Sequence, residues 1–266
     1  MHEPRLHQGG SAADSRWIWL FAGTAEGPPL AAALLERGWS VRVSLVTAAA
    51  ARAYRQHPQL ELKVGAASSD AGLDRELEWL APQWVVDATH PFAMDITARL
   101  ERVCRQRQQP WLQLDRRSTA QTSPDHEVHL LDDLAGLKAM ELANERLLLA
   151  IGVRQLPMAL AATPHCQHFA RVLDQPGSLQ AALACGLPDD HIACLRPDAS
   201  GEGPLEEALC RRWRIDRVLC RQGGGRSERL WRRVCLRMKL PVLLLRRPTA
   251  VAGLPMAALL EKLGNP

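Results

Sequence analysis

The chain lacks the features that mark membrane, secreted and zinc-stabilised proteins. No apolar run in its 266 residues approaches the roughly 20 needed to cross a bilayer. Residues 1–15 contain no apolar stretch of the kind a secretory signal requires, and we expect a loose tail there. The seven cysteines are scattered and form no Cys-x-x-Cys pair, which favours reduced thiols over disulfides or structural zinc. We therefore expect a cytoplasmic protein without a metal site or a membrane partner.

Two motifs of nucleotide-dependent enzymes are missing as well. The single tyrosine, Tyr54, is followed by Pro58 at the position where a short-chain dehydrogenase has its lysine, which argues against that class. The Gly-x-Gly-x-x-Gly fingerprint of many dinucleotide-binding proteins is also absent. A nucleotide site in this chain must therefore use a different turn.

The sequence does contain a repeated alternation of short apolar runs with longer helical stretches. The first series predicts strands at 17–22, 41–46, 60–64, 84–88 and 111–114 and helices at 28–37, 71–80 and 94–106. The second series predicts strands at 127–130, 146–151, 168–173, 191–195, 217–221 and 242–246 and helices at 132–143, 156–162, 179–184, 205–213 and 227–237. This pattern predicts an α/β fold with two parallel sheets flanked by helices. We place the N-terminal domain at 16–117 and the C-terminal domain at 118–266, joined by a polar segment near 115–126.

Ligands of open α/β sheets bind beyond the carboxyl ends of the strands, so the turns from strand to helix are the candidate functional segments. The 21–27 turn reads Phe21-Ala22-Gly23-Thr24-Ala25-Glu26-Gly27 and opens a helix, which suits phosphate binding; a plain tight turn is the alternative. The 87–93 turn reads Asp87-Ala88-Thr89-His90-Pro91-Phe92-Ala93 and gathers polar side chains at the end of a strand. Here the alternative is that Asp87 or Thr89 only caps the next helix.

Two turns in the second half have the same position relative to their strands. The 221–227 turn contains Gly223, Gly224 and Gly225 between Arg221 and Arg226, and it predicts either an anion-binding nest or a flexible turn. The 151–155 turn contains Gly152 and Arg154 and gives a weaker signal of the same kind.

Together these turns resemble segments of the precorrin-6A reductase family. The 87–93 turn resembles the family signature Asp-Ala-Thr-His-Pro-Phe-Ala at every position, and the 21–27 turn is similar to its Gly-Gly-Thr-x-Glu nucleotide loop, with Ala22 in place of one glycine. The run Arg246-Arg247-Pro248 matches an Arg-Arg-Pro near the family's C-terminus. The chain departs from the family where Arg221 and Gly223 stand in place of the usual lysine and serine. The resemblance covers roughly residues 17–253.

The resemblance implies two Rossmann-like domains with the active site in the cleft between them. It also implies NAD(P)H-dependent reduction of a ring double bond in precorrin-6A, or in its cobalt form, during cobalamin biosynthesis. The alternative is a diverged or non-catalytic nicotinamide-nucleotide-binding protein of the same fold. The residues we expect to bind the cofactor are Gly23, Thr24, Ala25, Glu26, Ser44, Thr47, Thr89 and His90.

Two expectations concern the chemistry of this site. The predicted second strand and its end, residues 41–47, contain no acid that could hold the ribose hydroxyls of NADH, whereas Ser44, Thr47 and Arg52 could receive a 2′-phosphate. We therefore expect NADPH, with NADH as the alternative. We assign His90 and Asp87 to catalysis, with His90 as proton donor and Asp87 orienting the turn; a structural histidine is the alternative.

The segment 211–247 is rich in arginine and contains only two acids, Asp216 and Glu228. Such an excess of positive charge favours an anionic partner, which could be nucleic acid, a membrane surface or a polycarboxylate. Apart from Trp213 and Trp231 the segment lacks aromatic residues for base stacking, so we do not expect nucleic acid. The resemblance points to an anionic tetrapyrrole, and the residues expected to bind it are Gly152, Arg154, Arg221, Gly223, Gly224 and Gly225. The sequence does not indicate an oligomeric state.

Overall fold

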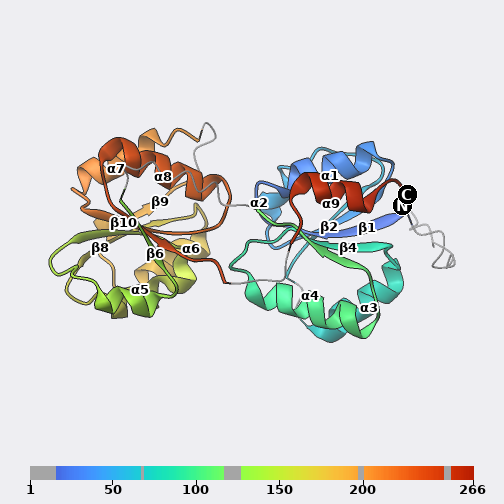
Figure 1. Ribbon diagram of the computed structural model, residues 1–266, viewed down its shortest axis with the longest axis horizontal. Helices are drawn as coiled ribbons and strands as arrows, with labels where there is room; N and C mark the ends of the chain where they lie inside the picture. Colours follow the sequence, from blue (N-terminus) through green and yellow to red (C-terminus); the bar gives the residue numbers. More distant parts are fainter. Residues whose placement is uncertain (1–15, 67–68, 117–126, 197–200, 249–252) are drawn as a thin grey trace. The chain divides into compact units, whose positions relative to one another are not determined.

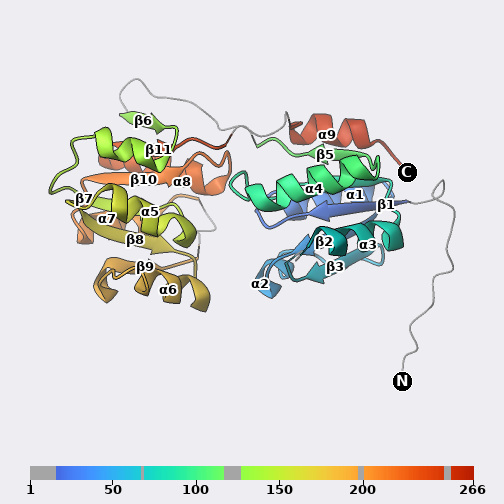
Figure 2. The ribbon, with the colours of Figure 1, turned by 90° about the horizontal axis from the view of Figure 1, so that it is seen from below.

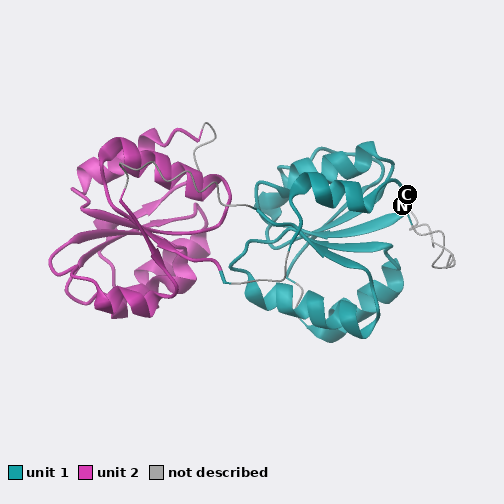
Figure 3. Ribbon diagram, in the orientation of Figure 1, with its two compact units in different colours: residues 1–116, 248–266 teal, residues 117–247 magenta. Residues whose placement is uncertain are grey.

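The fold is described from a computed structural model that covers residues 16–66, 69–116, 127–196, 201–248 and 253–266. The expected tail at 1–15 and nearly all of the expected linker lie outside these residues. The chain divides into two compact units (Figure 3). Unit 1 consists of Met1–Arg116 and Pro248–Pro266, and unit 2 of Arg117–Arg247. Each unit is described by itself below.

Unit 1 contains a five-stranded sheet whose order is β3-β2-β1-β4-β5 (Figure 2). Its strands are β1 (Trp17–Phe21), β2 (Ser40–Leu45), β3 (Leu60–Val64), β4 (Trp84–Asp87) and β5 (Trp111–Gln113). Every pairing between them is parallel. Because β1 pairs with both β2 and β4, the strand order reverses beside β1, and the turns after β1 and β4 lie at this reversal.

Helices cover both faces of this sheet, which is why its central strands are almost wholly apolar (Figure 1). One face packs against α1 (Gly27–Glu36) and α9 (Met256–Leu263), and the other packs against α3 (Asp70–Leu80) and α4 (Met94–Gln106). Proline at the first positions of α1 fixes a helical φ where no N–H partner is needed. A four-residue helix, α2 (Ala48–Ala51), follows β2.

Unit 2 contains a six-stranded sheet whose order is β6-β11-β10-β7-β8-β9. Its strands are β6 (Val128–Leu131), β7 (Arg146–Ala150), β8 (Gln167–Val172), β9 (Ile192–Cys194), β10 (Arg217–Arg221) and β11 (Val242–Leu245). These pairings are also parallel. The order reverses between β7 and β10, so the turns that follow these two strands lie beside each other.

In unit 2, α7 (Pro204–Arg212) and α8 (Arg226–Met238) cover one face of the sheet, and α5 (Leu156–Ala162) and α6 (Pro176–Leu183) cover the other (Figure 1). Three short 3₁₀ turns also occur in this unit: η2 (Leu134–Ala139), η3 (Val153–Gln155) and η4 (Asp189–His191). Within the described residues, no helix of either unit is both long and apolar enough to span a bilayer.

The prediction of two parallel α/β sheets is confirmed, and the predicted strands coincide with observed ones to within about two residues at each end. The predicted helix at 132–143 is wrong, because the segment forms only η2. The Asp133 carboxylate accepts a hydrogen bond from the Gly136 N–H at 3.0 Å, and buried Leu134 and Leu137 are three residues apart, the period of a 3₁₀ turn.

The predicted end of the C-terminal domain also differs from the structure, because residues 253–266 return to unit 1. Leu114 and Leu254 form a parallel bridge, and the Asp115 N–H donates to Leu254 O at 2.8 Å. Leu259 lies in the core beside α1, and the buried Trp39 indole donates to Gly264 O at 3.0 Å. Helix α9 was missed in the sequence, although an apolar run between Pro255 and Gly264 carries helix start and stop signals.

This arrangement predicts which unit a mutation in α9 destabilises. Leu259 is fully buried, so Leu259→Ala should lower the free energy of unfolding of unit 1 by about 2–5 kcal/mol. Hydrogen exchange should accelerate in β1 and β2 and stay unchanged in β7 and β10. Glu261→Ala, at an exposed position of the same helix, should change stability by less than about 0.5 kcal/mol. Loss of protection in β7 and β10 alone would contradict the assignment of α9 to unit 1.

Candidate active site

The 21–27 and 87–93 turns meet at the reversal of the sheet in unit 1. They follow β1 and β4, which pair directly, and the Ala88 N–H donates to Phe21 O at 2.8 Å. The Thr24 hydroxyl donates to Ala88 O at 3.3 Å. The structure therefore brings together the two segments that the sequence marked as candidates for cofactor binding and catalysis.

In the 21–27 turn, successive N–H groups have no acceptor in the part of the chain that the structure describes. The N–H groups of residues 23–26 donate to no atom among the described residues, whereas the Gly27 N–H closes the turn on Thr24 O at 3.2 Å. These groups precede the first turn of α1, where the helix dipole favours negative charge. No atom lies within 4 Å of the position that a Cβ on Gly23 would take, so an anion can approach this backbone closely.

Asp87 organises the 87–93 turn through a carboxylate that is 1% exposed. Its Oδ1 accepts from the Thr89 N–H at 2.9 Å and from the Thr89 hydroxyl at 2.6 Å. Its Oδ2 accepts from the Thr97 hydroxyl in α4 at 2.7 Å. Three donors therefore satisfy the oxygens of this buried carboxylate and fix the backbone before His90.

His90 is half-buried, and its ring nitrogens have different surroundings. Nδ1 accepts from the Phe92 N–H at 3.2 Å, and the two rings lie 5.7 Å apart between centroids. A proton added at Nδ1 would break this hydrogen bond. A ring that accepts at Nδ1 carries its hydrogen on Nε2.

Arg116 is a residue of this site that the sequence analysis missed, because it was taken as the start of a linker. Its guanidinium is buried and donates from Nη1 to Glu26 Oε2 and from Nη2 to Thr89 O, each at 3.0 Å. One side chain thus contacts both turns. A charged residue two positions beyond the end of a strand was the only sequence signal for it.

The expected 2′-phosphate ligands lie around the end of β2. The Ser44 hydroxyl accepts from the Trp19 indole at 2.8 Å and retains its own hydrogen for donation. Thr47 caps α2, where its side chain accepts from the Ala50 N–H at 3.3 Å. Arg52 is exposed at the other end of α2. None of these residues carries a negative charge that would repel a phosphate.

In unit 2, the reversal of the sheet brings Gly152 and Arg221 together. A Cβ on Gly152 would lie 3.4 Å from Arg221 Nη2, so this glycine allows the guanidinium to pack over the 151–155 turn. Its φ of +83° also favours glycine. Arg154, two residues further on, is exposed.

The 221–227 turn is less open to an anion than its glycines suggest. The Gly224 N–H donates at 2.7 Å to Oε2 of Glu228, a buried acid in the first turn of α8, and the Gly223 N–H donates to Arg221 O at 2.8 Å. Among the three glycines, Gly225 alone has an N–H without an acceptor in the described part of the chain. Two of the three glycine N–H groups that the sequence predicted for anion binding therefore already donate to acceptors within unit 2.

The sequence predicts that most arginines of 211–247 lack an acidic partner, and the structure contradicts this. Acids outside that segment pair with many of them: Glu207 with Arg211 and Arg237, Glu202 with Arg233 and Arg237, Glu145 with Arg217, and Asp132 with Arg246. These acids are distant in sequence or one helical turn away, so counting charges within the segment missed them. Local pairing therefore offsets much of the positive charge that the sequence places in this segment.

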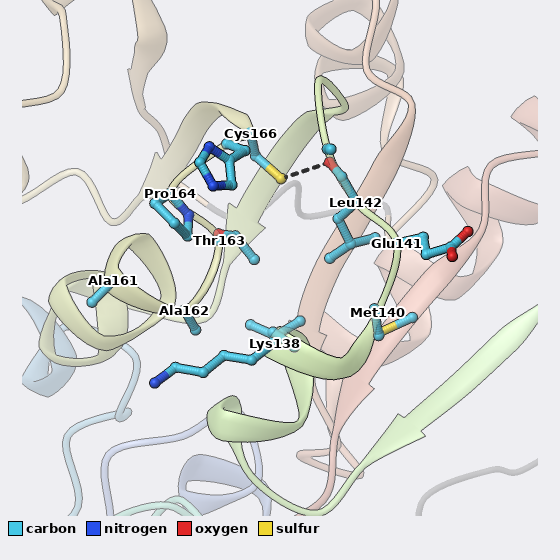
Figure 4. A pocket seen from close by; sticks show the side chains of 12 residues that line it. Lys138, Met140, Glu141, Leu142, Ala161, Ala162, Thr163, Pro164 and Cys166 are labelled. Atoms are coloured by element: carbon cyan, nitrogen blue, oxygen red, sulfur yellow. Dashed lines mark hydrogen bonds between the residues drawn. The ribbon is translucent and has the colours of Figure 1, made fainter.

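A cavity of about 560 Å³ lies at the opposite, amino-terminal edge of the sheet in unit 2 (Figure 4). It is lined on one side by Lys138, Met140 and Leu142, which precede β7, and on the other by Thr163 and Cys166, which precede β8. The Cys166 thiol donates to Leu142 O at 3.0 Å, and burial raises its pKa, so it stays protonated. This edge does not hold ligands in open α/β sheets, and we place no active site there. No group of metal-ligating side chains occurs among the described residues.

The fold and these turns define a class: two-unit α/β proteins in which a glycine-containing turn leads from the first strand of the first unit into a helix. Comparison with known proteins identifies the family within this class. The model of the precorrin-6x reductase family, CbiJ/CobK, matches residues 17–263, and the chain belongs to that family.

Individual relatives agree with this assignment. The chain is 29% identical to a cobalt-precorrin-6A reductase of Synechocystis over 89% of its own length and 90% of the relative's. It is 28% identical to a precorrin-6A reductase of Rhodobacter capsulatus over 92% of each chain. A solved structure named CobK precorrin-6A reductase superimposes with a TM-score of 0.75 at 24% identity, covering 94% of this chain and 98% of that one, and supports the fold.

Proposed function

We propose that the chain is an NADPH-dependent reductase that reduces one ring double bond of precorrin-6A, or of its cobalt-containing form, in cobalamin biosynthesis. Family membership and the names of the relatives support the substrate. The observation that carries the cofactor assignment is the row of N–H groups at residues 23–26 without acceptors among the described residues. The seven free cysteines suit the cytoplasm, where thiols stay reduced.

In this proposal the 21–27 turn binds the pyrophosphate of the cofactor. The N–H groups of Gly23, Thr24 and Ala25 donate to phosphate oxygens, and the dipole of α1 adds to the attraction. The 2′-phosphate is received by Ser44, Thr47 and Arg52 around the end of β2. When bound, the nicotinamide supplies a hydride.

The 87–93 turn then holds the reacting groups in position. Asp87 fixes Thr89 through the hydrogen bonds to its carboxylate, which makes it an orienting residue and leaves it no role in proton transfer. His90 donates a hydrogen bond from Nε2, because Nδ1 already accepts from Phe92. The proton that must accompany the hydride then comes from water, and His90 acts as a hydrogen-bond donor in place of the expected proton donor.

Substrate binding falls to unit 2. A precorrin carries several carboxylate side chains, and arginine binds carboxylates through paired N–H donors. Arg154 and Arg221 follow the two strands at the reversal of the sheet, with Gly152 leaving room for Arg221. Gly225 can add one backbone donor, whereas Gly223 and Gly224 shape the turn.

Replacing His90 tests its role. His90→Ala should lower turnover about tenfold or more with little change in thermal stability, because the lost group is a positioned donor. His90→Gln should retain more activity, since its amide also offers an N–H. Steady-state rates and melting curves of both variants decide the matter. If Gln and Ala are equally impaired and the loss depends on pH, His90 supplies a proton; if both only unfold more easily, it is structural.

The cofactor preference is checked by titrating the protein with NADPH and NADH and by adding precorrin-6A with each nucleotide while absorbance is followed. We expect tighter binding and faster reduction with NADPH, because no acid stands in residues 40–47 to hold the ribose hydroxyls. Arg52→Ala should narrow the difference between the two nucleotides. Equal or tighter binding of NADH would overturn the preference.

Substrate binding is tested with Arg154→Ala and Arg221→Ala. Each should raise the substrate KM about tenfold, with NADPH affinity nearly unchanged, because a charged hydrogen bond is lost. The effect should shrink at high salt, where screening weakens the arginine's contribution. Arg212→Ala, at an exposed position of α7, serves as the control with an unchanged KM. Weaker NADPH binding with an unchanged substrate KM would mean that the two ligands are assigned to the wrong units.

A further inference from the structure

The backbone just before Arg116 is held by two hydrogen bonds. The Leu114 N–H donates to Asp87 O at 2.8 Å, and the Asp115 N–H donates to Leu254 O at the same distance. The side chain of Arg116 is only 6% exposed. A buried guanidinium is costly unless its charge is paired, so the partners of Arg116 matter.

The compensation comes from both turns at the reversal of the sheet. The salt bridge to Glu26 is 3.0 Å long with both side chains largely buried, and the hydrogen bond to Thr89 O has the same length. The two turns are also joined by the longer hydrogen bond from the Thr24 hydroxyl to Ala88 O, at 3.3 Å. Arg116 therefore joins the 21–27 and 87–93 turns through one salt bridge and one hydrogen bond.

Glu26 gives this link an electrostatic consequence. Its carboxylate sits immediately before α1, beside the N–H groups that have no acceptor among the described residues. An unpaired carboxylate there would repel a phosphate, whereas a carboxylate paired with a guanidinium repels it much less. The guanidinium thus keeps the turn able to accept an anion.

We propose that Arg116 is a positioning residue that neutralises Glu26 in the phosphate-binding turn and fixes the backbone of Thr89 beside His90. Nucleotide affinity and turnover then both depend on it, through different contacts. The contact with Glu26 governs affinity, and the contact with Thr89 O governs the placement of His90. The inference rests on the proposed function and deepens it.

The test uses four variants of the whole chain: Arg116→Met, Arg116→Lys, Glu26→Gln, and Arg116→Met combined with Glu26→Gln. Arg116→Met should weaken NADPH binding about tenfold to hundredfold, the effect of losing a charged contact. The double variant should recover most of that affinity, because the unpaired negative charge is gone. Arg116→Lys should bind NADPH within about threefold of the parent but turn over about tenfold more slowly, since one ammonium cannot reproduce both forked contacts.

If Arg116 were only structural, adding Glu26→Gln to Arg116→Met would not restore NADPH affinity. That result, or a parent-like kcat in Arg116→Lys, would overturn the inference. Arg102→Met serves as the matched control, because Arg102 forms an exposed pair with Asp70 at 2.6 Å in the same unit and should not affect NADPH binding. If Arg116→Met does not fold, Arg116→Lys and Glu26→Gln still supply the separate tests of kcat and affinity.

Hydrogen exchange of the ligand-free protein separates this inference from the proposed function. Residues 23–26 and 89–93 should exchange faster together in Arg116→Met than in the parent, whatever nucleotide the protein binds. If they do so while the parent binds no nicotinamide nucleotide, the proposed function fails and the link between the turns stands. If the parent binds NADPH but only one turn, or neither, exchanges faster, the link fails and the proposed function stands.

Discussion

Parallel pairing of β1 with β2 on one side and β4 on the other is the constraint on which the architecture of unit 1 depends. Parallel strands are joined by crossover connections, and these are almost always right-handed. Because β2 and β5 lie on opposite sides of the β1–β4 pair, the connections that follow β1 and β4 run over opposite faces of the sheet. The connections therefore diverge, and the carboxyl ends of these strands are left uncovered. The N–H groups before α1 that have no acceptor among the described residues, and the turn fixed by Asp87, both occur there, where the backbone stays accessible to solvent or a ligand. The pairing of β10 with β7 has the same consequence in unit 2.

At these edges, buried charges are placed so that each fixes a turn. Asp87 accepts three hydrogen bonds, Arg116 joins two turns, and Glu228 ties Gly224 to α8 while pairing with Arg232. A buried charge adds little net stability, but removing its partner leaves a large penalty, so each such group holds a single geometry. Residues exposed beside them, such as Arg154, remain available to a ligand. The division between fixed and available groups is what a preorganised site requires.

Much of the fold could be predicted from the sequence because the determining signals are local. Buried apolar runs such as those of β1 and β10, and helix signals such as the prolines of α1, lie within single elements. Two errors are local, the 3₁₀ segment η2 predicted as a helix and the missed helix α9; the others concern interactions between distant residues. The pairing of Glu145 with Arg217 and the contacts of Arg116 join residues far apart in the chain, and no periodicity reveals them. The 87–93 turn was recognised because its polar residues are consecutive, whereas the internal use of the Gly223 and Gly224 N–H groups depends on Glu228 and on backbone conformation.

The return of the chain to unit 1 after residue 247 affects how the protein is made. Unit 2 is inserted between two parts of unit 1, and Leu259 and Leu263 of α9 complete the core around α1. Domains usually fold as units, in the order in which they leave the ribosome. Here all residues of unit 2 are synthesised before α9, so the unit that begins first is finished last. During synthesis the apolar face of α1 therefore stays uncovered until α9 is made, and by then unit 2 has had time to fold.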